Sequence, residues 1–127
     1  MWPPTSDEAA AALRVRELLS YLPASATEPP PHAAPREPEL DDPGILVPAE
    51  PRCAYDVREP LRAIVDEGSI FELCPRWARN IVTALARVEG RPVAIIANQP
   101  HHLGGVLDAA ASEKAARRPT RATCRRD

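Results

Sequence analysis

The stretch from Pro23 to Pro60 contains ten of the sixteen prolines in this chain of 127 residues. Proline lacks a backbone N–H and fixes φ, so it is poorly tolerated in helix interiors and in central strands. These 38 residues are therefore not expected to join a packed core, and fewer than 90 residues are left to build one. A chain of that size buries proportionately little surface on folding and is only marginally stable alone.

The proline-rich composition predicts an extended, semi-rigid linker, which we assign to residues 24–53. A second interpretation stays open, in which the prolines form a polyproline ligand for a small adaptor domain.

A first helix is predicted before the linker. Thr5 and Glu8 have capping-box spacing, and Pro23 stops the pattern after Leu22. The helix has one apolar stripe, which needs a partner surface and consists of Val15, Leu18, Leu19 and Leu22.

A second helix is expected over residues 57–67, with Asp56 as its N-cap and Gly68 as its stop. Pro60 falls in the first turn, where it is tolerated. The expected buried face consists of Val57, Leu61, Ile64 and Val65.

Three β segments follow. Residues 69–73 have short β character, and residues 81–88 and 93–97 flank Glu89-Gly90, a typical two-residue hairpin connection. Residues 93–97 are apolar throughout, which predicts a strand covered on both faces. Because these strands alone cannot cover it, we expect an associating or poorly stable protein in which residues 57–97 form the compact unit, detached from the first helix.

After the last strand, a short helix is expected to begin at Glu113, capped by Ser112 and stopped by Pro119. Residues 118–127 are basic and lack apolar periodicity. We favour disorder for them over a tail that binds nucleic acid nonspecifically.

The net charge of −2 gives no global field for nucleic acid or an anionic membrane. Apolar runs fall short of the roughly 18–20 residues of a membrane span, and the first residues lack a signal-peptide pattern, so a cytoplasmic location is expected. Cys53, Cys74 and Cys124 have no CxxC spacing, which argues against a disulfide framework or a zinc ribbon. We expect Cys74 to be a buried apolar residue.

A series of motifs resembles one known family. In chain order they are Arg16-Glu17-Leu18-Leu19-Ser20-Tyr21-Leu22-Pro23, Tyr55-Asp56-Val57-Arg58-Glu59, Asn80-Ile81-Val82, Arg87-Val88-Glu89-Gly90-Arg91-Pro92-Val93, Ala97-Asn98-Gln99-Pro100, Gly105-Val106-Leu107-Asp108 and Ala111-Ser112-Glu113-Lys114-Ala115-Ala116-Arg117. Together they closely resemble the middle of the carboxyltransferase (beta) subunit of acyl-CoA carboxylases of the propionyl-CoA carboxylase type. The resemblance covers residues 7–117, in order and with consistent spacing.

The resemblance implies an α+β fold, an incomplete crotonase-like (ClpP/crotonase-type) carboxyltransferase fragment. It assigns residues 1–23 to the last helix of the N-terminal carboxyltransferase domain, residues 24–53 to the interdomain linker and residues 54–117 to the start of the C-terminal domain. The sequence diverges from the family after Arg117, and for residues 118–127 our hypothesis is a frameshift in GC-rich coding DNA.

The family's subunit takes a carboxyl group from carboxybiotin and places it on the α-carbon of an acyl-CoA such as propionyl-CoA or acetyl-CoA. The resemblance therefore implies no cofactor bound directly, because the biotin is on a partner subunit or domain. The implied partners are carboxyltransferase beta subunits and the biotin carboxylase/biotin carrier alpha subunit, with no nucleic acid and no membrane.

The family's catalytic glycine-rich segments lie outside these motifs, so we expect no catalytic residues here and a chain that is inactive alone. The alternative is a noncatalytic interaction module that docks on full-length carboxylase subunits through its strand edge or through Leu18 and Leu19.

The candidate site is the loop after the apolar strand, because α/β architectures place ligands beyond the carboxyl ends of strands. Its residues, adjacent to substrate or biotin, are Asn98, Gln99, Gly104 and Gly105. The alternative, in which Asn98 and Gln99 only satisfy loop backbone groups, stays open.

Two other groups near this loop contain residue types that occur in functional sites. Adjacent side chains diverge, and no further ligand has a suitable spacing, so His101-His102 predicts no metal site. Asp108 and Glu113 are expected to serve a helix N-terminus rather than to act as an acid–base pair.

Overall fold

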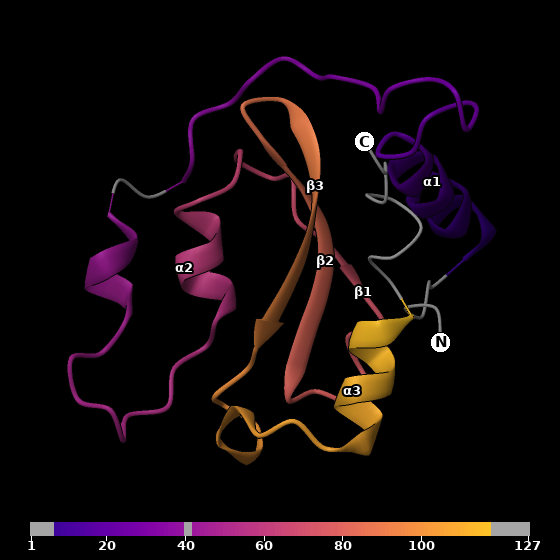
Figure 1. Ribbon diagram of the computed structural model, residues 1–127. Helices are drawn as coiled ribbons and strands as arrows, with labels where there is room; N and C mark the ends of the chain where they lie inside the picture. The colour runs from indigo at the N-terminus through magenta and orange to yellow at the C-terminus, as the bar shows by residue number, and fades with distance from the viewer. Residues whose placement is uncertain (1–6, 40–41, 118–127) are drawn as a thin grey trace.

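The structure, a computed structural model, describes residues 7–39 and 42–117. Its sheet is antiparallel, in the order β1-β2-β3, and the helices lie around it (Figure 1). The elements are α1 (Glu8–Leu19), a 3₁₀ turn (Pro43–Leu46), α2 (Arg58–Arg62), β1 (Phe71–Leu73), β2 (Ile81–Val88), β3 (Arg91–Asn98), a second turn (Leu103–Gly105) and α3 (Ala109–Ala116). The expected α+β class is confirmed.

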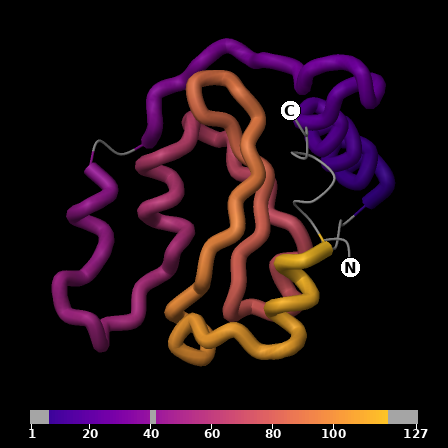
Figure 2. Tube along the Cα trace, viewed as in Figure 1, coloured from indigo at the N-terminus to yellow at the C-terminus, as the bar shows by residue number. Residues whose placement is uncertain are grey.

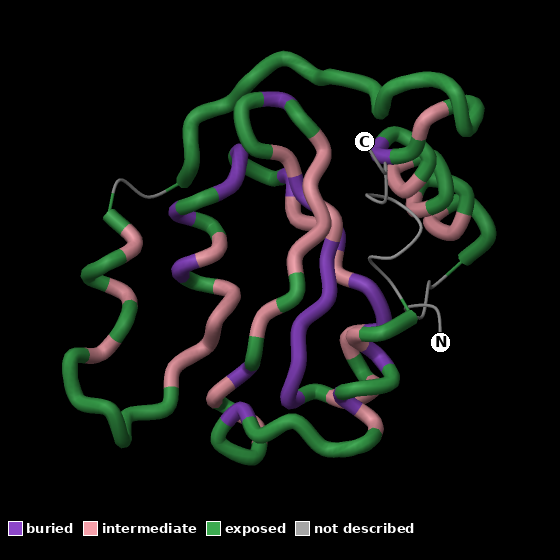
Figure 3. Tube along the Cα trace, viewed as in Figure 1, coloured by how far each residue is buried: buried purple, intermediate pink, exposed green. Residues whose placement is uncertain are grey.

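The central strand β2 is the best covered part of the sheet (Figure 3). Ile81, Val82 and Ala84 on this strand are buried, because β2 has a hydrogen-bonded neighbour on each edge. Beside it, the core cluster joins Tyr21 with Phe71 and Leu73 of β1.

Residues 93–97 lack cover on both faces within this chain, as expected, because no residue of β3 is buried. In the described part of the chain, β3 pairs on one edge only, with β2, and Ile96 is 45% exposed. Pro92 lies within β3 opposite Arg87, a position that an edge strand tolerates.

The hairpin between β2 and β3 is confirmed. Glu89 (φ 51°) and Gly90 (φ 77°) both adopt the left-handed conformation that a type I′ turn requires. The buried Asp66 carboxylate holds this turn, since it accepts hydrogen bonds from Glu89 N (2.8 Å) and Gly90 N (2.7 Å).

Helix α1 is not detached from the compact unit, contrary to our expectation. The buried Tyr21, just after the helix, donates a hydrogen bond to Ser69 O. The Arg14 guanidinium lies 4.3 Å from the centre of the Phe71 ring, and that of Arg87 lies 4.2 Å from the centre of the Tyr21 ring. These contacts join residues far apart in sequence, and the linker does not prevent them.

The ends and the stripe of α1 also differ from expectation. Asp7 is the N-cap and accepts a hydrogen bond from Ala10 N, while Thr5 lies outside the described residues. Of the four stripe residues, Leu18 packs against the core cluster. The other three, Val15, Leu19 and Leu22, are exposed.

The proline-rich linker is exposed throughout residues 24–39 and passes over the tip of the hairpin (Figure 2). Ala33 N donates to Gly90 O (2.9 Å), and Glu67 N donates to Glu37 O (3.3 Å). Residues 24–39 are thus extended, as predicted, but attached to the hairpin at Ala33, whereas Pro43–Leu46 of the predicted linker form a 3₁₀ turn.

Helix α2 is shorter than predicted, because it spans Arg58–Arg62 rather than residues 57–67; its N-cap is Val57 rather than Asp56, and Ile64 is exposed. The chain turns after Ala63 so that Val65 is buried and Asp66 reaches the hairpin. Pro60 is also buried, so one residue of the proline-rich stretch does join the interior.

Helix α3 begins four residues earlier than predicted. Asp108, not Ser112, is its N-cap and accepts a hydrogen bond from Ala111 N (2.8 Å). Because the helix has eight residues, Glu113 lies inside it and pairs with Arg117. Pro119, Cys124 and residues 118–127 lie outside the described residues, so the expectations for them are not addressed.

Candidate functional site

The loop after β3 contains a left-handed turn. Leu103, Gly104 and Gly105 all have positive φ, between 50° and 75°. Gly105 N donates to His102 O (2.9 Å), which closes the turn. Gly104 is exposed, whereas Gly105 is buried against Asn98 and Pro100.

Gln99 is fully buried, and its Oε1 accepts a hydrogen bond from His101 N of its own loop (3.4 Å). Its Oε1 also accepts a hydrogen bond from Val57 N (3.2 Å), and its Nε2 donates to Asp56 Oδ1 (2.7 Å). Its backbone N–H donates to Asn80 O (2.9 Å). The Gln99 side chain therefore connects the end of β3 to the start of α2.

Asp56 is the acceptor at the centre of this connection. Partial burial acts to raise the pKa of Asp56, but hydrogen bonds from Arg58 N and Gln99, together with the Arg58 charge, outweigh burial and lower it. Arg58 in turn forms a bidentate pair with Glu72 of β1, at 2.8 Å and 2.7 Å. The ionised form of Asp56 is thus part of the packing between α2, β1 and the loop.

The four predicted site residues do not converge on one point. Asn98 and Gly105 lie side by side, Gly104 is exposed and Gln99 bonds to Asp56. Gln99 Oε1 accepts from two backbone N–H groups, Val57 N before α2 (3.2 Å) and His101 N in the loop (3.4 Å).

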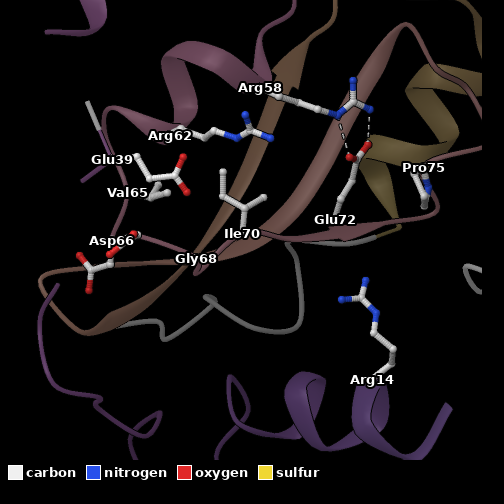
Figure 4. Close-up of a pocket in the computed structure, with 11 residues that line it drawn as sticks. Arg14, Glu39, Arg58, Arg62, Val65, Asp66, Gly68, Ile70, Glu72 and Pro75 are labelled. Atoms are coloured by element: carbon white, nitrogen blue, oxygen red, sulfur yellow. Dashed lines mark hydrogen bonds and ion pairs between the residues drawn. The ribbon is translucent and has the colours of Figure 1, made fainter. Parts of the chain in front are cut away.

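A cleft of about 420 Å³ lies elsewhere, between α1, α2 and β1 (Figure 4). Arg14 points into it from α1, and Arg58 and Arg62 point into it from α2. These guanidinium groups are paired with acidic side chains, Arg14 with Glu17, Arg58 with Glu72 and Arg62 with Glu59. Of these pairs only Arg58–Glu72 joins two elements, and none of the four predicted residues lines the cleft.

Metal ligation finds no support within residues 7–39 and 42–117, where no cluster of three His, Cys, Asp or Glu residues could hold an ion. The rings of His101 and His102 meet edge to face, with centroids 6.5 Å apart. Cys74 is buried, as predicted.

Sequence reasoning missed the Arg58–Glu72 pair and the Asp56–Gln99 bond. Their members are 14 and 43 residues apart, so no local periodicity could reveal them.

Comparisons with known proteins agree with the fold described above. The carboxyl transferase domain model matches residues 4–126. The chain belongs to the carboxyl transferase domain family. The carboxyltransferase subunit of propionyl-CoA carboxylase from Haloferax mediterranei is 43% identical over 116 residues, which are 89% of this chain and 22% of that protein. The mitochondrial beta chain from Sus scrofa is 40% identical over 113 residues, 84% of this chain and 20% of that protein.

Solved structures of this family share the fold. The transcarboxylase 12S subunit superposes with a TM-score of 0.81 at 41% identity, over 88% of this chain and 23% of that one. A single-chain, multi-domain long-chain acyl-CoA carboxylase gives a TM-score of 0.72 at 42% identity, over 86% and 10% of the two chains. This chain is thus a crotonase-like fragment that spans about a fifth of the length of the relatives it matches. None of the described helices is long and apolar enough to cross a membrane.

Biotin and acyl-CoA, which this family implies, are not matched by a built site among the described loop residues. Stabilising an oxyanion requires preorganised N–H donors aimed at one point. The Gly105 N–H already donates to His102 O within the turn, so the Gly104-Gly105 pair does not supply two such donors. We therefore derive no reaction step through either group.

Proposed function

We propose that this chain is the interdomain part of a carboxyltransferase subunit of a biotin-dependent acyl-CoA carboxylase and that it does not catalyse carboxyl transfer alone. The observation that carries the proposal is the shared fold with the transcarboxylase 12S subunit, at 41% identity over 88% of this chain. That relative is described with hydrolysed methylmalonyl-coenzyme A bound, which supports an acyl-CoA as the substrate of the whole enzyme.

The proposal divides the chain into three parts. Residues 1–23 would end the N-terminal carboxyltransferase domain, residues 24–53 would link the domains and residues 54–117 would begin the C-terminal domain. The exposure of residues 24–39 supports the linker assignment. The proposed partners are carboxyltransferase beta subunits and an alpha subunit that carries biotin carboxylase and biotin.

The test is a reconstituted assay with biotin carboxylase, biotinylated carrier and propionyl-CoA. We expect no carboxylation above the blank that lacks the chain, because the loop polar groups are engaged in holding the fold. The full-length Haloferax mediterranei subunit, assayed with its own partners, is the positive control. Carboxylation by the purified chain above the blank would show that it contains a complete site.

A second candidate function is a noncatalytic module that docks on an intact carboxyltransferase subunit. It is favoured by exposed apolar side chains, Leu19 on α1 and Ile96 on the edge strand β3. Leu18 is no longer a candidate contact, since it packs against the chain's own core. Capture of intact beta subunits by the immobilised chain at low micromolar concentration would support the module, and absence of capture would remove it.

A further inference from the structure

Lys114 on α3 is the only lysine of the chain, among sixteen basic residues, and it is 2% exposed. Lysine is rarely buried without partners, because removal of its charge from water is costly. Its environment therefore needs an explanation that the proposed function does not supply.

The Lys114 ammonium group is bound by three backbone carbonyl oxygens. Nζ lies 2.8 Å from Trp77 O, 2.8 Å from Ile81 O and 3.3 Å from Ala78 O. A neutral amine has two N–H donors, whereas an ammonium has three, so only the cation can donate to all three oxygens. The arrangement is that of a small cation held by a shell of carbonyl dipoles.

The backbone that supplies these oxygens has an unusual conformation. Ala78 has φ +45°, a conformation that L-residues other than glycine seldom adopt. Such a conformation persists where surrounding contacts hold it. Lys114 is one of these contacts, because it binds the carbonyl of Ala78 itself.

We propose that the carbonyl oxygens of Trp77, Ala78 and Ile81 form a site for an ammonium-sized monovalent cation, which Lys114 fills from α3. This internal cation makes Lys114 a positioning residue for the loop after β3. The inference does not depend on the proposed function, because it concerns only how this chain holds its own loop.

The link from Lys114 to the loop runs through Asn80. The Asn80 side chain donates to Val106 O (2.7 Å) and to Asp108 Oδ1 (3.2 Å), while Asn80 O accepts from Gln99 N (2.9 Å). Residues 77–81 are thus attached to α3 through Lys114 at one end of the helix and through Asp108 at the other. The Lys114 ammonium group makes one of these attachments. The loop from Gln99 to Val106 is hydrogen-bonded to the same segment through Asn80.

The three contacts of the Lys114 ammonium group are all to backbone carbonyl oxygens, so none of them is to a carboxylate. Burial is the main reason why the pKa of Lys114 is lowered from 10.5. Glu72 on β1 and Cys74 after it act to raise that pKa, and Arg58 on α2 acts to lower it.

A single lysine permits a direct test on the unaltered chain. Labelling with ¹⁵N-lysine gives one Nζ signal in an NMR spectrum. At pH 7 we expect an ammonium signal with slow hydrogen exchange, and a titration midpoint below 10.5. A neutral amine at pH 7, or an ammonium that exchanges as fast as free lysine, would overturn the proposal. This result does not depend on whether any variant folds.

The variant Lys114→Ala tests the site by chemical rescue. We expect amides from Gln99 to Val106 to exchange at least about tenfold faster, as expected from the loss of a charge-assisted hydrogen bond. Ammonium or methylammonium chloride should restore part of the protection, whereas sodium or tetramethylammonium chloride at equal ionic strength should not. Equal effects of all four salts would contradict a cation site.

Two further variants test whether any positive charge at position 114, or the loss of any cation near the end of α3, would give the same result. Lys114→Arg keeps the charge, but its planar guanidinium does not match three converging carbonyls, so we expect it to lose protection as well. Arg117→Ala removes an exposed cation at the C-cap of α3, which lies 5.8 Å from the centre of the Trp77 ring rather than at the three carbonyls, and should leave the Gln99–Val106 amides within about twofold of wild type. Full protection in Lys114→Arg would show that any cation on α3 suffices and would reject the three-carbonyl site.

Discussion

Gln99 is a buried amide whose hydrogen bonds connect the loop after β3 to Asp56 and Val57. The position of Gln99, directly after a strand, is one where α/β proteins often bind ligands. In this chain its Oε1 and its Nε2 both bond to other parts of the protein. The amide therefore stabilises the loop, and its proximity to a strand end is not evidence of substrate contact.

Asp56 should make the stability of the chain sensitive to acid. The pKa of this carboxyl is lowered below its ordinary value of 3.8, so the folded state holds the proton less tightly than the unfolded state does. The stabilisation is fully present above pH 3.8 and is lost as pH falls through the lowered pKa. Asp56→Asn should cost about 1 kcal/mol of unfolding free energy at pH 7 and flatten the loss below pH 3.8.

Urea unfolding at several pH values checks this prediction, with Glu59→Gln as the matched control. Glu59 is an exposed carboxylate on α2 that pairs with Arg62 at the surface, so its removal should cost less than about 0.5 kcal/mol. An acid dependence that is identical in Asp56→Asn and the wild type would contradict the role given to Asp56.

At the scale of elements, the hairpin and the linker are joined by a close approach of two backbones. A Cβ atom added to Gly90 would lie 2.1 Å from Ala33 O, whereas one added to Gly68 would meet nothing within 4 Å. Both glycines have positive φ, at +77° and +66°. Alanine substitutions at these two glycines therefore separate two contributions to the free energy of unfolding. Both carry the cost of a left-handed conformation, and only Gly90→Ala also carries the cost of displacing the linker.

Gly90→Ala should release the linker, and Gly68→Ala should not. We expect Gly68→Ala to cost about 1 kcal/mol from conformation alone, and Gly90→Ala to cost more. Hydrogen exchange of the Ala33 amide, which donates to Gly90 O, should accelerate only in Gly90→Ala. If Ala33 exchanges at the wild-type rate in Gly90→Ala, the linker is not held at this point.

The same scale shows which parts of the fold were predictable. Strand β2, the Glu89-Gly90 turn and the presence of β3 follow from local pattern, because their residues pair with near neighbours in sequence. The attachment of α1 was missed, because Tyr21 bonds to Ser69 across 48 residues and leaves no periodic signal. The loop after β3 was predictable from the end of the apolar strand, but the contacts of Gln99 depend on Asp56, 43 residues away.

At the scale of the whole molecule, exposed apolar side chains should cause association. Ile96 lies on β3, which pairs on one side only among the described strands, and such an edge can pair with another chain. We expect sedimentation velocity to show oligomers at micromolar concentration and Ile96→Lys to reduce them at least about tenfold. A compact wild-type monomer with a cooperative melt would contradict this expectation.

The family assignment accounts for these features together. An exposed proline-rich segment and a strand β3 that pairs along one edge only among the described strands are consistent with a chain that spans about a fifth of its relatives' length. In a full subunit, the exposed surface of β3 would be available to the remainder of the carboxyltransferase. We therefore predict that this chain can replace the equivalent segment of a relative.

The most direct measurement is the activity of a chimaera. Residues 7–117 of this chain would replace the matching segment of the Haloferax mediterranei carboxyltransferase subunit, to which the chain is 43% identical. We predict that the chimaera assembles with the native partner subunits and carboxylates propionyl-CoA well above the blank, while residues 7–117 alone do not. Failure of the chimaera to assemble or carboxylate, where the parent subunit prepared in parallel does both, would contradict the central claim that this chain is a carboxyltransferase segment.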